Sequence, residues 1–391
     1  MDATLQAQLD QRRAEHLYRT RLNVATGCSS TLEVEGAVLA NFCSNDYLGL
    51  AAHPDVNNAL KKAVDHYGTG SGASHLISGH STAHQQLEEQ LADFTGRPRA
   101  LLYSSGYMAN MGTINALVGR HDLVLQDQLN HASLLDGGHL SRATSQRYKH
   151  SDLNNLQLRL EQSTAERKLI VTDGVFSMDG DLAPLAQLSE MAAAHNGWLM
   201  VDDAHGFGVL GKQGGGLVEA SNLSCEQVPV LVGTLGKSFG TFGAFVAGSE
   251  ALIESLIQFS RSYIYTTAMP PAIAAATLTS LKILRQETWR REKLAALIAR
   301  FRQGAGQIGL QLMNSSTPIQ PVVINDDEKV MQVSASLREQ ELLVGAIRPP
   351  TVPAGSGRLR ITFSAEHSEE QVDQLLAALD SCGLSRSSAG R

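Results

Sequence analysis

Three short polar groups in this sequence combine residue types that could do chemistry. In chain order they are Ser104–Tyr107, Asp202–His205 and the glycine-rich Gly233–Gly240, which contains Lys237. An amine can bond to an aldehyde, a carboxylate can pair with a ring nitrogen, and the backbone N–H groups that open a helix can bind phosphate. These three groups together are what an enzyme needs to hold pyridoxal phosphate (PLP).

The sequence supplies one residue for each of these tasks. Lys237 would form the Schiff base, Asp202 would pair with the pyridinium nitrogen, and the Ser105–Tyr107 turn would hold the phosphate. A carboxylate at the ring nitrogen keeps that nitrogen protonated, and the protonated ring withdraws electrons from a carbanion at the substrate's α carbon. We therefore interpret Lys237 and Asp202 as catalytic.

A nucleotide-binding P-loop is the competing interpretation of the lysine turn. Gly236, Lys237 and Ser238 match the end of G-x-x-x-x-G-K-[ST], but the first glycine would fall at Leu231, inside an apolar run. The register therefore disfavours a P-loop.

Two hydrolase patterns are also incomplete. His80 and His84 have the spacing of H-E-x-x-H, but Ser81 stands where the glutamate belongs, so we interpret both as surface or capping residues and expect no metal site. The run Gly79–Ala83 approaches G-x-S-x-G but ends in alanine and follows no apolar strand. Both a metalloprotease and a serine hydrolase are disfavoured.

The elements that must position these residues alternate along the chain between short apolar runs and amphipathic helices. This pattern predicts an α/β fold, a mainly parallel, doubly wound sheet whose carboxyl strand ends carry the ligand site. Helices are expected after Pro54, over Leu153–Glu161 and over Leu185–His195. The predicted strands are Ala100–Tyr103, Leu123–Leu125, Leu169–Thr172, Trp198–Val201, Val230–Val232 and Ala244–Ala247.

The domain organisation follows from a change of character near residue 286. A charged helix, isolated strands near Pro321–Ile324 and Arg358–Thr362, and a final helix near Glu369–Leu379 predict a small α+β domain. The predicted divisions are an N-terminal arm (1–45), a large PLP-binding domain (46–285), the small C-terminal domain (286–384) and a polar tail (385–391).

Composition narrows the possible function classes. The 391 residues include 32 basic and 39 acidic ones, so the net charge of −7 disfavours nucleic-acid binding. No segment approaches the roughly 20 apolar residues that a membrane helix needs, and we expect no membrane association. Four scattered cysteines indicate free thiols, and the N-terminal residues lack the pattern of a secretory signal. We expect a cytoplasmic protein.

Six segments of the chain together resemble the α-oxoamine synthases, a family of fold type I PLP enzymes that join an amino acid to an acyl thioester. The resemblance covers nearly the whole chain. The segments are SNDYLGL (44–50), SSGYMAN (104–110), NHAS (130–133), VFSMDGD (175–181), VDDAHG (201–206) and GTLGKSFG (233–240).

The resemblance implies a role for each matching position. Lys237 would bind the cofactor, Asp202 would pair with its nitrogen, His205 would contact its phenolic oxygen and His131 would stack on its ring. The remaining cofactor contacts implied are Gly106, Tyr107, Ser177 and Thr234, with Thr266 and Thr267 reaching the phosphate from a second subunit, because the family is dimeric.

Substrate contacts are implied in the same way. Asn45 and Arg348 would hold the amino-acid carboxylate, for which a guanidinium is suited, and Arg19 and Thr351 would be the remaining contacts. The segment AIRPPTVPAG (346–355) is most similar to that of members that join L-alanine to a pimeloyl thioester in biotin synthesis.

Several alternatives stay open at this point. The chain could be another α-oxoamine synthase, such as a glycine C-acetyltransferase, or a non-catalytic binding module with the same fold. Ala73 and His75 depart from the family pattern in a glycine-rich segment, which leaves the acyl contacts there open. The sequence does not distinguish pimeloyl-CoA from pimeloyl-acyl carrier protein as the acyl donor.

Overall fold

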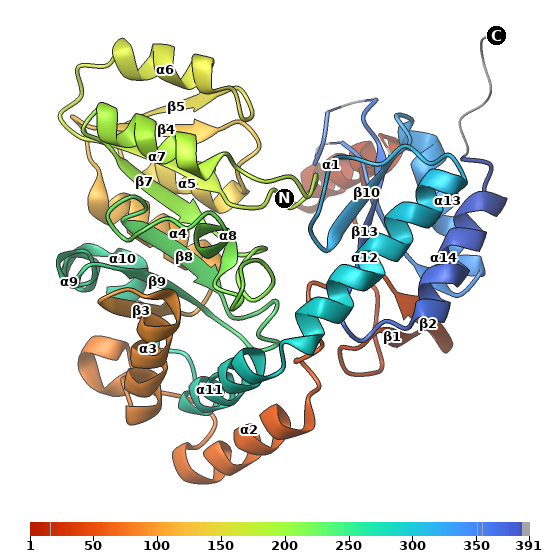
Figure 1. The fold of residues 1–391 in the computed structure, drawn as a ribbon, viewed down its shortest axis with the longest axis horizontal. Helices are drawn as coiled ribbons and strands as arrows, with labels where there is room; N and C mark the ends of the chain where they lie inside the picture. The colour runs from red at the N-terminus through yellow and green to blue at the C-terminus, as the bar shows by residue number, and fades with distance from the viewer. Residues whose placement is uncertain (16, 350, 354, 385–391) are drawn as a thin grey trace.

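A seven-stranded sheet forms the centre of the larger part of the molecule (Figure 1). The structure is a computed structural model that describes residues 1–15, 17–349, 351–353 and 355–384, so the predicted tail 385–391 lies outside the described residues. In spatial order the strands are β3 (Arg99–Tyr103), β9 (Ala244–Gly248), β8 (Val230–Thr234), β7 (Trp198–Asp202), β6 (Lys168–Asp173), β4 (Leu123–Asp127) and β5 (Thr144–Tyr148).

All strands of this sheet run parallel except β9, which is antiparallel to both of its neighbours. The predicted α/β fold with a mainly parallel sheet is confirmed, and so are all six predicted strands. The sequence did not predict β5. Its residues are mostly polar and partly exposed, because β5 lies at the edge of the sheet and lacks the apolar signal of a buried strand.

Successive strand residues pack into separate cores on the two faces of the sheet. Val124, Leu169 and Met200 contact one apolar cluster, while their neighbours in sequence contribute to the other. Burial on both faces explains why these strands are apolar without a break. The helices of this part are α2 (Pro54–Tyr67), α3 (Thr82–Thr95), α4 (Gly106–Leu117), α5 (Ala132–Leu140), α6 (Leu153–Glu161), α7 (Leu185–Ala194), α8 (Gly216–Ala220), α9 (Glu250–Phe259), α10 (Arg261–Ile264) and α11 (Pro271–Gln286), with a π-helix η1 over His75–Gly79.

The smaller part contains two three-stranded sheets covered by α12 (Trp289–Gln307), α13 (Asp327–Glu339) and α14 (Glu369–Ser381). One sheet has the order β10 (Ile319–Val323), β13 (Arg358–Thr362), β12 (Gly345–Ile347). The other pairs β1 (Thr31–Val34) and β2 (Ala37–Asn41) with β11 (Leu342–Leu343). Strand β2 therefore ties residues of the predicted N-terminal arm to the C-terminal part of the chain.

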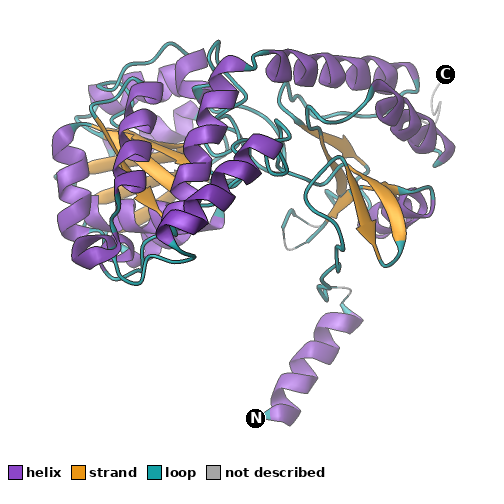
Figure 2. Cartoon of the chain, turned by 90° about the horizontal axis from the view of Figure 1, so that it is seen from below, coloured by secondary structure: helices purple, strands orange, loops and turns teal. Residues whose placement is uncertain are grey.

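Helix α1 (Asp2–Ala14) has no buried residues and extends away from both parts (Figure 2). Among the described residues, no helix, α1 included, is both long enough and apolar enough to cross a membrane. All four cysteines are free thiols, as the sequence predicts.

Gly240 brings the lysine turn against the SNDYLGL segment. Its φ is +64°, and a Cβ added there would lie 2.2 Å from the backbone nitrogen of Ala51. The opposing loop is fixed by the Asp46 carboxylate, which accepts hydrogen bonds from the N–H groups of Leu50 (2.9 Å) and Ala51 (3.0 Å). Neither the backbone conformation nor the available space at Gly240 suits another residue.

We expect Gly240→Ala to lower the free energy of unfolding by about 2 kcal/mol or more, because left-handed backbone and a main-chain clash both oppose the methyl group. Urea unfolding monitored by circular dichroism measures this change. Gly119→Ala is the matched control, since its added Cβ meets nothing within 4 Å. Equal unfolding midpoints for the two variants would contradict the close approach at Gly240.

Candidate active site

A lysine amine and a histidine ring meet at the carboxyl ends of β7 and β8. The Nζ of Lys237 lies 2.8 Å from the Nε2 of His205. Burial lowers the pKa of Lys237 to about 8, although Asp202 and Asp173 act to raise it. Burial, reinforced by the charge of Lys237, also lowers the pKa of His205 well below its usual range. His205 is therefore a neutral imidazole whose Nε2 accepts a hydrogen bond from the lysine.

The other nitrogen of His205 begins a chain of hydrogen bonds with one direction. With Nε2 accepting, Nδ1 carries the proton and donates to the Tyr47 hydroxyl oxygen at 2.6 Å. Tyr47 in turn donates to the Asn45 Oδ1 at 3.1 Å, and burial raises the pKa of Tyr47 to about 12, so that its proton is kept. The chain fixes the tautomer of His205 and the orientation of Asn45.

Arg360, on β13 of the smaller part, ends this chain. Its Nη2 donates to the Asn45 Oδ1 at 3.2 Å, and its Nε donates to the Ser177 carbonyl at 2.6 Å. The positive charge of the guanidinium acts to lower the pKa of both Lys237 and His205, so Arg360 lies near both groups. A cation and an amide side by side can bind a carboxylate.

Asp202 lies at the end of β7 and is held by two donors. Its Oδ2 accepts from the Nδ2 of Asn110 at 2.6 Å, and its Oδ1 accepts from the backbone N–H of Ala204 at 3.0 Å. Asn110 also donates to the Ser133 hydroxyl, and its own buried Oδ1 has no partner among the described residues. These bonds fix the carboxylate without using all of its acceptor capacity.

His131 caps the N-terminus of α5 beside this carboxylate. Its backbone N–H donates to Asp173 at 2.7 Å, and its Nδ1 contacts the Ser133 hydroxyl at 2.7 Å. Its ring lies edge-to-face with that of Tyr107, with centroids 6.2 Å apart. Burial and the neighbouring Asp202 hold the pKa of Asp173 well above its usual range, so the carboxyl groups that end two adjacent strands influence each other.

The N-terminus of α4 provides an anion site on the same side of the sheet. Ser105 caps the helix by accepting from Met108 N–H, and the N–H groups of Gly106 and Tyr107 have no acceptor among the described residues. Unsatisfied N–H groups at a helix start attract phosphate. Thr267 of the same chain adjoins this turn, because its carbonyl accepts from the Ser104 hydroxyl at 3.4 Å.

Two more predicted cofactor contacts are half-buried threonines. Thr234 ends β8, three residues before Lys237, and its hydroxyl donates to the Gly243 carbonyl at 3.2 Å. Thr266 precedes Thr267 in the segment that leads to α11. The amine, the fixed carboxylate and the free N–H groups suit the aldehyde, ring nitrogen and phosphate of PLP, so the donor set fits this cofactor.

Three predicted substrate contacts, Arg19, Arg348 and Thr351, form no hydrogen bond with this cluster among the described residues. Arg348 does not contact Asn45; its Nε donates instead to the Met331 sulfur at 3.3 Å, and its backbone carbonyl accepts from Thr351 N–H. Arg348 lines a cleft of about 720 Å³ between α13 and the segment around Tyr18. Arg19 is exposed in that segment.

His75, His80 and His84 form a cluster whose nitrogens lie within 4.8 Å of one another. The Nε2 of His84 contacts the Met269 carbonyl at 2.7 Å, and its Nδ1 accepts from Ser81 N–H at 3.0 Å. With both nitrogens occupied, His84 serves as the capping partner of α3. It is fully buried and not on the surface.

Sequence reasoning did not single out Tyr47, Asn110 or Arg360. Tyr47 and Asn110 both lie inside recognised segments, but the prediction gave neither a role. A signal for Arg360 was available, because an arginine inside a predicted strand needs a buried partner. No local pattern pairs it with Asn45, which lies 315 residues earlier.

Comparison with known proteins identifies the relatives of this chain. Residues 37–379 match the family described as aminotransferase class I and II. The 8-amino-7-oxononanoate synthase of Pseudomonas putida is 62% identical over 378 residues, covering 97% of each chain. Among solved structures, serine palmitoyltransferase from S. paucimobilis with a bound PLP–myriocin aldimine has a TM-score of 0.91 at 31% identity, covering 97% of this chain and 96% of that one. The 8-amino-7-oxononanoate synthase of Francisella tularensis has a TM-score of 0.77 at 34% identity, covering 88% and 97%.

The lowered pKa of Lys237 predicts selective reactivity toward an aldehyde. Only a neutral amine attacks a carbonyl, so imine formation with pyridoxal, trapped by borohydride and located by mass spectrometry, should rise as the pH passes about 8. Asp202→Asn removes a carboxylate that favours the ammonium form, and should shift this rise down by roughly one pH unit.

Lys212→Ala, which changes an exposed lysine, is the control and should leave the profile of Lys237 unaltered. If imine formation at Lys237 were half-maximal only near the pH typical of an exposed lysine, the amine would not be desolvated.

Proposed function

The chain belongs to the class I and II aminotransferase family and is a PLP-dependent acyltransferase of the 8-amino-7-oxononanoate synthase kind, and from this premise we propose that it joins L-alanine to a pimeloyl thioester. The products would be 8-amino-7-oxononanoate, carbon dioxide and the free thiol. The identity of about 60% to synthases of this name, against 31% for a serine palmitoyltransferase, is the observation that carries the choice.

The residues of the site divide the work of this condensation. When bound, PLP supplies an electron sink for the charge left on the α carbon of alanine. Lys237 takes the α proton, and its pKa of about 8 makes the neutral amine available near neutral pH. Neutral His205 accepts a hydrogen bond from the amine and keeps it in place without competing for a positive charge.

Asn45 and Arg360 bind the carboxylate of alanine in this proposal. Their contact and the bond of Arg360 to the Ser177 carbonyl hold both groups in position. Asp202 would pair with the ring nitrogen of PLP, His131 would stack on its ring, and the N-terminus of α4 would hold its phosphate. Arg19 and Thr351 keep their predicted role as further substrate contacts, whereas Arg360 takes the carboxylate-binding role that was predicted from the sequence for Arg348.

The acyl donor and the assembly are also part of the proposal. We propose that the enzyme works as a homodimer in the cytoplasm. The Thr267 carbonyl binds Ser104 of its own chain, and we propose that the hydroxyl groups of Thr266 and Thr267 serve the phosphate site of the other chain, as the resemblance implies. Either pimeloyl-CoA or pimeloyl-acyl carrier protein could deliver the acyl group. A glycine C-acetyltransferase activity remains the alternative within the same chemistry.

The purified PLP-loaded enzyme should form 8-amino-7-oxononanoate from L-alanine with at least one of the two pimeloyl carriers, as followed by mass spectrometry. Lys237→Ala should lower turnover by roughly a thousandfold or more, because the proton acceptor is lost. Turnover of glycine with acetyl-CoA, without turnover of alanine with either pimeloyl carrier, would overturn the proposal.

The two candidate arginines can be separated by kinetics. Arg360→Lys should raise the KM for L-alanine about thirtyfold or more, because losing a hydrogen-bonded partner of a buried charge costs about 2 kcal/mol or more. Arg348→Lys is the matched variant and should raise this KM less. The reverse ranking would assign the carboxylate to Arg348, as the sequence predicts.

A further inference from the structure

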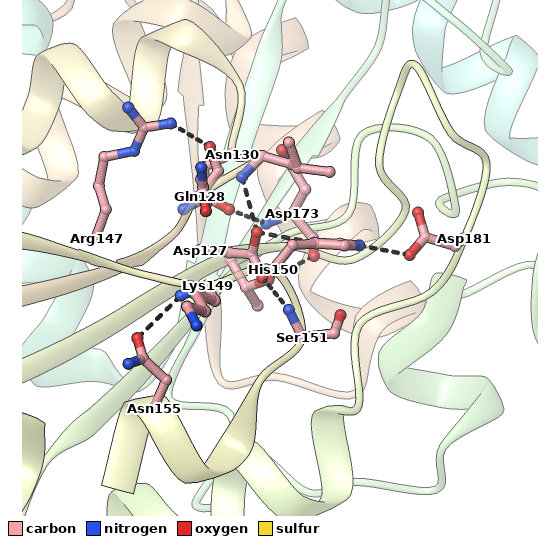
Figure 3. A network of polar contacts seen from close by, with 12 residues as sticks. Asp127, Gln128, Asn130, Arg147, Lys149, His150, Ser151, Asn155, Asp173 and Asp181 are labelled. Atoms are coloured by element: carbon pink, nitrogen blue, oxygen red, sulfur yellow. Dashed lines mark hydrogen bonds and ion pairs between the residues drawn. The ribbon is translucent and has the colours of Figure 1, made fainter. Parts of the chain in front are cut away.

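His150, just after β5, lies between two carboxylates (Figure 3). Its Nδ1 is 2.9 Å from the Oδ1 of Asp127, and its Nε2 is 2.8 Å from the Oδ2 of Asp181. A neutral imidazole carries a single N–H, whereas both of these nitrogens face an acceptor. The geometry therefore calls for the doubly protonated, positively charged ring.

The charges that face His150 come from two elements. Asp127 ends β4, while Asp181 and the more distant Asp179 belong to the loop that follows β6; Arg358 forms an ion pair with Asp179. Burial acts to lower the pKa of His150, but the hydrogen bonds and charges of Asp127 and Asp181 raise it to about 10. The Phe176 ring also packs against His150, edge-to-face, with the ring centroids 4.5 Å apart.

One carboxylate connects His150 to the segment that carries His131. Asp127 accepts from the backbone N–H groups of Leu129 (2.8 Å) and Ser151 (2.9 Å) as well as from His150. The segment runs from Leu129 through Asn130, which donates to the Val171 carbonyl, to His131. A shift of Asp127 would therefore move the start of this segment.

The other carboxylate connects His150 to the loop that carries Ser177. Asp181 closes this loop, because its backbone carbonyl accepts from Phe176 N–H at 3.1 Å. Ser177 lies inside the loop, and its carbonyl binds Arg360. Besides the single bridge between Val175 and Leu182, the loop is bound from the smaller part by Arg358 at Asp179, by Arg360 at the Ser177 carbonyl and by Thr317 at the Gly180 carbonyl. The bond between His150 and Asp181 adds its connection to the segment that follows β5.

We propose that His150 is a positioning residue that, as an imidazolium, ties the His131 segment to the Ser177 loop and so holds two sides of the cofactor site at a fixed separation. The proposal rests on the proposed function only for the identity of the cofactor. It assigns His150 no contact with PLP or substrate.

The affinity for PLP tests whether His150 holds the His131 segment and the Ser177 loop together. His150→Gln leaves Asp127 and Asp181 facing each other without a cation between them, so the dissociation constant for PLP should rise roughly tenfold, a size usual for coupled charged neighbours. The double variant His150→Gln with Asp181→Asn removes one of the two charges and should recover a large part of this affinity. His139→Gln, at an exposed histidine on α5, is the control and should bind PLP like the parent.

The affinity is measured by titrating cofactor-free protein with PLP, and thermal unfolding of each variant is followed in parallel. Failure of the double variant to bind better than His150→Gln, with both variants folded, would show that charge repulsion is not the cause and would overturn the proposal. An unchanged affinity in His150→Gln would overturn it as well.

The protonation state is observed directly by ¹⁵N NMR of histidine-labelled, cofactor-free protein, with the signal assigned through its loss in His150→Gln. His150 should stay doubly protonated until the pH nears 10, and Asp181→Asn should lower its titration. A neutral His150 ring at pH 8 would contradict the proposal that His150 connects the two segments as an imidazolium. Neither readout involves alanine or a thioester, so a failed product assay would count against the proposed function and leave this inference standing.

Discussion

The hydrogen bond between the Lys237 amine and a neutral His205 is the interaction on which the rest of the site depends. An ammonium group buried beside a second cation would be costly, and burial instead shifts both groups toward their neutral forms. The neutral imidazole then has one acceptor and one donor nitrogen. That single assignment sets the direction of every bond from Lys237 through Tyr47 to Asn45.

Parallel strands explain why these groups meet at all. Asp173, Asp202 and Thr234 end neighbouring strands, so their side chains emerge along the same edge of the sheet. The charges of these two carboxyl groups act to raise the pKa of Lys237 and partly offset the effect of its burial. The smaller part adds Arg360 from β13, so the site is completed only where the two parts of the chain meet.

The sequence predicted those features that depend on residues close together in the chain. Apolar runs marked the strands, and the residues after them included Lys237, Asp202 and His205, which the structure brings together. Contacts between segments far apart in the chain could not be inferred in this way. Asn45 with Arg360 and Asp127 with His150 depend on tertiary packing, and the edge strand β5 lacks the apolar pattern that reveals a buried strand.

The pairing of β2 with β11 has a consequence for the order in which the protein is assembled during synthesis. Residues 37–41 emerge from the ribosome early, but the strand that completes their sheet, Leu342–Leu343, emerges about 300 residues later. The larger sheet, over residues 99–248, has all of its strands before then. Contacts between such distant segments form slowly, so the hairpin of β1 and β2 must wait with one edge unpaired while the rest of the chain folds beside it.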